Sequence, residues 1–138
     1  MARTLILDSE ALNALARAKE RPTLALRARA ILTVAHEERA LVRVPSPVLA
    51  EVYRGGARDA PIDHVLNDRG IIVTPLTASI ARRGGALLAR AKLSSAHAVD
   101  AFVVATAIEL GPAIVATHDP DDMKKLSAGI REVRVVSI

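Results

Sequence analysis

Short runs of apolar residues recur along this chain, and a segment with helical spacing separates each run from the next. The runs cover residues 4–7, 41–44, 71–73, 114–117 and 133–137. Continuous apolar runs of this length are typical of strands buried on both faces, and strands that alternate with helices form parallel sheets. We therefore predict an α/β fold, a three-layer sandwich in which helices cover both faces of a five-stranded parallel sheet.

Capping and helix-breaking residues mark where the intervening helices begin and bend. Ser9 and Ser46 each precede a helical pattern, and Thr77 precedes the longest pattern after the third run. Short hydroxyl side chains favour the first position of a helix because they accept its free N–H groups. Gly84-Gly85 interrupts the helix after Thr77, which predicts either a kink or a close backbone contact there.

The bulk composition predicts one domain, residues 1–138, with a sizeable core. Apolar residues make up 51% of the chain, and no apolar stretch approaches the roughly 18 residues of a membrane span. Asp8 and Glu10 interrupt the first apolar run, so it does not have the pattern of a signal peptide. We expect a cytoplasmic protein without membrane contact. The absence of cysteine excludes disulfides, thiolate metal sites and cysteine nucleophiles.

The formal net charge of +4 comes mainly from arginine, which supplies 15 of the 19 basic residues. Arginine binds phosphate groups with two hydrogen bonds, so this surface suits a polyanion such as RNA. An ordinary solvated surface is an equally good interpretation. Tyr53 and Phe102 are the only aromatic residues, which excludes extensive base stacking.

Four acidic residues, which are the candidate catalytic and metal-binding residues, stand among apolar neighbours. They are Asp8, Glu51, Asp100 and Asp119. A carboxylate removed from water is costly unless a cation or hydrogen-bond donors offset the loss of solvation. No Lys or Arg lies among the apolar residues that immediately flank these acids. A shared metal site is therefore our hypothesis.

The predicted topology allows these acids to meet. Asp8 and Asp119 follow the first and fourth strands, and parallel sheets bind ligands at the carboxyl ends of strands where the strand order reverses. Glu51 and Asp100 each lie about one turn into a helix. Oxygen ligands without cysteine suit Mg²⁺ or Mn²⁺, and such ions activate water for phosphodiester cleavage.

Each acid also has a structural explanation. Asp119 before Pro120 is an ordinary helix cap, Asp8 is a strand-end residue, and Glu51 has the spacing to pair with Arg54. Asp100 is the hardest to explain structurally, because its helix has almost no polar face.

Three further side chains are weaker candidates near this site. Ser9 and Thr117 are caps or strand-end hydroxyls that are also placed to hold a metal-bound water or orient a carboxylate. His97 precedes Asp100 by three residues, although a histidine at a helix start is more often a surface or capping residue.

These residues, in this order, resemble the PIN-domain family, and within it the ribonuclease toxins of VapBC-type toxin–antitoxin pairs. The similarity extends over nearly the whole chain. The matching pieces are Leu7-Asp8-Ser9, Leu49 to Gly55, Val99-Asp100-Ala101 with Ala105-Thr106-Ala107, and Val115 to Asp122.

The resemblance implies a parallel sheet of order 3-2-1-4-5 and an endoribonuclease that depends on Mg²⁺ or Mn²⁺. The metal-binding acids of the family fall on Asp8, Glu51, Asp100 and Asp119, and its strand-end hydroxyl falls on Thr117. It also implies a cognate antitoxin that masks the site, an RNA substrate and a homodimer.

Two other classes of protein are compatible with parts of the pattern. A catalytically inactive PIN-like module that binds RNA or protein would not need four desolvated carboxylates. A receiver-type signalling domain needs an Asp after the third strand, where this chain has Thr74-Pro75. The nuclease is therefore our leading hypothesis.

Overall fold

The computed structural model, which describes residues 3–68 and 70–138, contains one sheet of five parallel strands. The strands are β1 (Thr4–Leu7), β2 (Leu41–Pro45), β3 (Ile71–Thr74), β4 (Ala113–Thr117) and β5 (Val133–Ser137). Their order is β3-β2-β1-β4-β5, so the strand order reverses between β1 and β4. This topology confirms the predicted fold and strand order.

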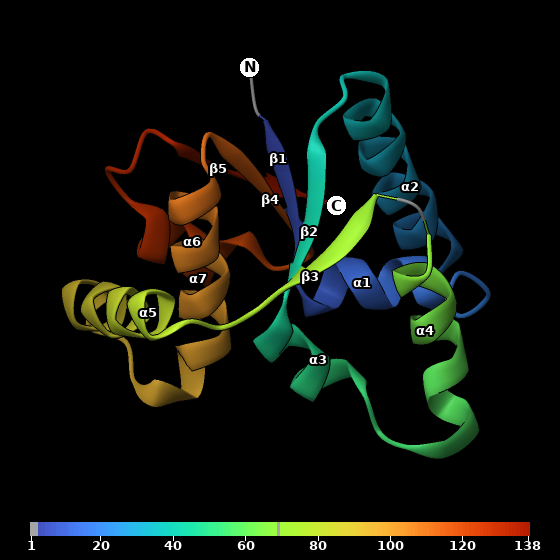
Figure 1. Cartoon of the computed structure of the whole chain (residues 1–138), viewed down its shortest axis with the longest axis horizontal. Helices are drawn as coiled ribbons and strands as arrows, with labels where there is room; N and C mark the ends of the chain where they lie inside the picture. The colour runs from blue at the N-terminus through green and yellow to red at the C-terminus, as the bar shows by residue number, and fades with distance from the viewer. Residues whose placement is uncertain (1–2, 69) are drawn as a thin grey trace.

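Helices cover both faces of the sheet and complete a three-layer arrangement. They are α1 (Ser9–Ala16), α2 (Pro22–Glu37), α3 (Ser46–Val52), α4 (Ala60–Leu66), α5 (Ala78–Ala91), α6 (Ala98–Leu110) and α7 (Pro120–Ser127), with short 3₁₀ turns η1 (Gly56–Asp59) and η2 (Ser95–His97). Helices α1, α2 and α4 lie on one side of the sheet, and α5, α6 and α7 lie on the other (Figure 1). Within the described residues, no helix has the length and apolar character to cross a bilayer.

The core lies on both sides of the central strand. Ile6 and Leu7 of β1 are fully buried, as are Val103 and Val104 of α6. Burial of each such side chain contributes about 1.5–3 kcal/mol to folding. Because α6 is apolar around most of its circumference, it packs against the sheet, α5 and α7 at once. The helix that carries Asp100 is therefore packed on several sides.

Two helices begin differently from the prediction. Asp8 rather than Ser9 caps α1, because Asp8 Oδ1 accepts the N–H of Ala11 at 2.9 Å and Ser9 is already the first helical residue. The hydroxyl of Ser46, the first residue of α3, accepts the N–H of Leu76 at 3.0 Å. Ser46 thus joins α3 to the segment that follows β3 instead of capping its own helix.

Helix α5 begins as predicted, and its paired glycines have different environments. The hydroxyl of Thr77 accepts the N–H of Ile80 at 3.1 Å. A Cβ atom on Gly84 would lie 2.8 Å from the ring of Phe102 on α6, whereas one on Gly85 would have no neighbour within 4 Å. The predicted close contact therefore occurs at Gly84, where α5 packs against α6.

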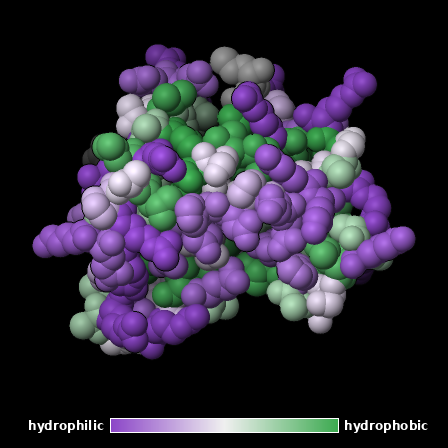
Figure 2. Space-filling model, turned by 180° about the vertical axis from the view of Figure 1, so that it is seen from behind, coloured by the Kyte–Doolittle hydropathy of each residue, from purple (hydrophilic) through white to green (hydrophobic). Residues whose placement is uncertain are grey.

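The surface also carries an apolar pocket of about 270 Å³ near the amino ends of β1 and β4. Its lining includes Leu5, Ile31, Val34 and Ile114. Seen from behind, the surface of the molecule shows apolar residues interspersed with hydrophilic ones (Figure 2). None of the four predicted acids lines this pocket, so it is separate from the predicted acidic site.

Candidate metal centre

The reversal of strand order brings the ends of β1 and β4 side by side. Asp8 directly follows β1, and its backbone N–H donates to the carbonyl oxygen of Ala116 in β4 at 3.4 Å. Thr117 is the last residue of β4. The side chains of Asp8 and Thr117 consequently lie at the crevice where parallel sheets bind ligands.

Asp8 is the most deeply buried acidic residue of the predicted set, with 4% of its surface exposed. Burial raises the pKa of its carboxyl group from 3.8 to about 7, and the charges of Glu10 and Asp100 add to this increase. Interactions with the Thr117 hydroxyl and the Ala11 N–H partly oppose it. The side chain is thus held in place, but its ionised form is poorly solvated.

Asp100 lies in the first turn of α6 and is half-buried. Burial is also the main reason that its pKa is raised, to about 6, followed by the negative charges of Glu51, Asp122 and Asp119. The nearby ring of His97 acts in the opposite direction. Three neighbouring acids therefore contribute to the raised pKa of Asp100.

Glu51 and Asp119 are exposed, so the prediction that all four acids are desolvated is wrong for these two. Glu51 lies on α3 between the buried residues Val48 and Val52, which face the core. Asp119 occupies the capping position of α7 but makes no capping hydrogen bond with its side chain. Both acids nevertheless act electrostatically on Asp100.

The two supporting hydroxyl residues differ in their surroundings. The Thr117 hydroxyl lies 3.2 Å from the backbone nitrogen of Asp119 and 3.3 Å from its carbonyl oxygen, and it also interacts with Asp8. Thr117 therefore links the two strand-end acids. Ser9 is half-buried at the start of α1, next to Asp8.

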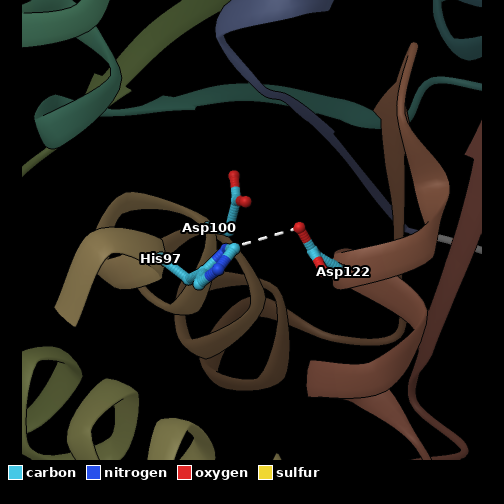
Figure 3. Close-up of side chains that lie close together, drawn as sticks. All are labelled: His97, Asp100 and Asp122. Carbon is cyan, nitrogen blue, oxygen red and sulfur yellow. Dashed lines mark ion pairs between the residues drawn. The ribbon is translucent and has the colours of Figure 1, made fainter. Parts of the chain in front are cut away.

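The structure also brings Asp100 together with two side chains, His97 and Asp122, that were not among the four predicted metal-binding acids. One ligand atom each from His97, Asp100 and Asp122 lies within 4.8 Å of the other two (Figure 3). His97 Nδ1 and Asp122 Oδ2 are 3.3 Å apart. Among residues 3–68 and 70–138, this is the only set of three such side chains at that spacing.

The helical spacing of the sequence contained a signal that Asp122 faces the rest of the protein. Asp122 precedes Leu126 by four residues, which places both on one side of α7, and Leu126 is fully buried. From the sequence alone, Asp122 was not assigned a role at the predicted site. Its approach to His97 depends on how α7 packs against α6, which local patterns do not specify.

No basic residue in the described part of the chain forms an ion pair with Asp8, Glu51, Asp100 or Asp119. The two ion pairs found there both involve Asp122, with His97 at 3.3 Å and with Lys125 at 4.0 Å. The acids around Asp100 therefore have an excess of negative charge that this part of the protein does not neutralise.

The strand order reverses between β1 and β4, and acidic side chains lie near the point of reversal. These features define a class of α/β proteins, and one family model matches this chain. The chain belongs to the PIN-domain family, whose model matches residues 5–129. A search of the curated proteins finds no match to this sequence.

Two solved structures share the fold. VapBC2 from Rickettsia felis, bound to a DNA fragment from its promoter, matches with a TM-score of 0.68 and 13% identity over 98% of both chains. A toxin–antitoxin complex from Klebsiella pneumoniae matches with a TM-score of 0.64 and 20% identity, over 97% of this chain and 99% of the other. At these identities the similarity is one of fold.

Proposed function

We propose that this chain is a divalent-metal-dependent endoribonuclease and the toxin component of a toxin–antitoxin pair. The observation that carries the proposal is the packing of α6 against β1, which brings Asp8 at the end of β1 and Asp100 in the first turn of α6, distant in sequence, into one region. The charge of Asp100 contributes to the raised pKa of Asp8. Membership of the PIN-domain family supports the same conclusion.

The donor set fits Mg²⁺ or Mn²⁺. The proposed ligands Asp8, Glu51, Asp100 and Asp119 offer only oxygen atoms, which these ions prefer. The raised pKa values of Asp8 and Asp100 follow from burial and like charge, and a bound cation would lower both. A cation would thus remove the electrostatic cost of placing these carboxylates together.

The residues have separate proposed roles at this centre. Asp8 is held through Oδ1 by the Ala11 N–H, which leaves its second oxygen for the ion. Thr117 positions Asp8, and Ser9 is proposed to support the same region. Glu51 and Asp119 are exposed, so their carboxylates are free to turn toward the ion or toward water. When bound, the ion would activate water and stabilise the leaving oxygen of a phosphodiester.

The charge of the remaining surface supports an RNA substrate. Because the four proposed ligands contribute −4, the rest of the chain carries a formal charge of +8. Arginine-rich surfaces attract phosphate backbones without requiring a particular base sequence. A bound ion and this surface would act on the same polyanion.

The similarity of fold to a toxin–antitoxin complex supports the proposal of an antitoxin partner. We further propose that the chain is a single PIN domain over residues 1–138, that it acts in the cytoplasm, and that two copies form a homodimer. Sedimentation analysis of the purified chain tests the dimer, and a monomer at all concentrations would contradict it.

Incubation of the purified chain with total RNA, with Mn²⁺ or with a chelator, tests the activity. We expect cleavage with Mn²⁺ alone, reduced about hundredfold or more by Asp100→Asn because a metal ligand is lost. Asp68→Asn is the matched control, since Asp68 is exposed between α4 and β3 and is not one of the proposed ligands. RNA binding without cleavage by the wild type would instead favour a non-catalytic binding module.

A further inference from the structure

The side chain of His97 is positioned for a role that its place in the sequence does not explain. His97 occupies the capping position of α6, yet its ring makes no capping hydrogen bond. The ring is instead directed toward Asp122 on α7, and Asp100 lies beside both (Figure 3). The structure therefore argues against the interpretation of His97 as a helix cap.

The spacing of the three side chains corresponds to the dimensions of one metal site. Ligand atoms in an octahedral site lie about 2.1 Å from the ion, so adjacent ligands are about 3 Å apart and opposite ligands about 4.2 Å apart. His97 Nδ1 and Asp122 Oδ2 are 3.3 Å apart, and all three ligand atoms lie within 4.8 Å of one another. Small side-chain rotations would bring them onto one ion.

The charges at this position favour a metal ion over a simple ion pair. Two carboxylates, those of Asp100 and Asp122, lie beside a single imidazole ring, so His97 alone cannot balance both negative charges. Lys125 lies near the other oxygen of Asp122, at 4.0 Å, but is itself largely exposed. Asp100 forms no ion pair within the described residues.

We propose that His97 is a direct ligand of the divalent ion, together with Asp100 and Asp122. The inference rests on the proposed function, because it assigns further ligands to the same metal centre. Imidazole nitrogen suits transition-metal ions, whereas Mg²⁺ prefers oxygen. The site therefore selects Mn²⁺ over Mg²⁺.

Pulsed electron paramagnetic resonance of the full chain loaded with MnCl₂ tests the bond between manganese and nitrogen. We expect electron spin-echo modulation from a coordinated ¹⁴N nucleus, which changes to the ¹⁵N pattern when the protein contains ¹⁵N-labelled histidine. The modulation should disappear in His97→Gln and persist in His64→Gln, a matched change on the distant helix α4. The labelled wild type tests nitrogen coordination even if His97→Gln fails to fold.

Competition between the two ions provides a second readout. The concentration of Mg²⁺ that displaces half of the bound Mn²⁺ should fall about tenfold or more in His97→Gln, because a ligand that discriminates between them is lost. Mn²⁺ binding without histidine coupling, or coupling that survives in His97→Gln, would overturn this inference while the proposed nuclease stands. A wild type that binds no Mn²⁺ would overturn both.

Discussion

Replacing Asp8 with Asn should stabilise the metal-free protein at neutral and alkaline pH. Asp8 is 4% exposed, and burial is the largest cause of its raised pKa. Asparagine has nearly the same shape and caps helices as well as aspartate does, so it keeps an acceptor for the Ala11 N–H. The substitution removes the ionisation while it preserves the cap.

The pKa values determine the size and direction of the effect. Asp8 has a pKa of about 7 in the folded protein and 3.8 as its ordinary value. Between these values the folded protein retains a proton that the unfolded chain has released, so the stability of the wild type falls as the pH rises. At about 1.4 kcal/mol per pKa unit, the cost above pH 7 reaches roughly 4 kcal/mol.

Urea denaturation of both proteins in a chelator, from pH 4 to pH 9, measures this difference. The gain in unfolding free energy for Asp8→Asn should be near zero at pH 4 and approach its maximum above pH 8. Added Mn²⁺ should then stabilise the wild type more than the variant. Parallel pH profiles for the two proteins would refute the argument that burial raises the pKa of Asp8. Asp8→Ala, which loses the cap, is expected to gain about 1 kcal/mol less.

Three further predictions concern α5 and the surface. Gly84→Ala should lower the unfolding free energy by about 1–3 kcal/mol, because the new methyl group overlaps the Phe102 ring. Gly85→Ala should raise it by up to about 1 kcal/mol, because nothing lies near its Cβ position. Equal effects of the two changes in thermal denaturation would contradict the close contact between Gly84 and Phe102. Thr77→Ala should cost about 1 kcal/mol and Thr77→Ser much less, since serine keeps the cap, and similar melting temperatures for the two would argue against it. RNA affinity should fall about tenfold or more between 50 and 200 mM salt, and a flat titration would exclude a phosphate-binding surface.

Most of the fold was predictable because its signals are local. The apolar runs gave nearly correct strand positions, and Thr77 marks the true start of α5. The predicted cap at Ser9 was displaced by one residue because Asp8 has an equally good capping side chain and makes the bond. A sequence pattern does not show which of two adjacent capping residues makes the bond, whereas the hydrogen-bond geometry of the structure does.

The environment of the acids was less predictable. Glu51 has apolar neighbours in sequence, but successive helical residues point about 100° apart, so Val48 and Val52 face the core while Glu51 faces water. The proximity of His97 to Asp122 depends on the packing of α7 against α6, where Met123 and Leu126 are buried. Apolar neighbours in the sequence therefore do not show whether a side chain on a short helix is buried.

The position of β4 beside β1 also affects how the protein forms during synthesis. Asp8 emerges early from the ribosome, but its neighbour Thr117 belongs to a strand made more than a hundred residues later. Until that strand inserts, β1 has a free edge and the acids from the two halves of the chain remain apart. A truncated translation product that lacks β4 would therefore have no complete centre, and any activity would begin only when synthesis is nearly finished.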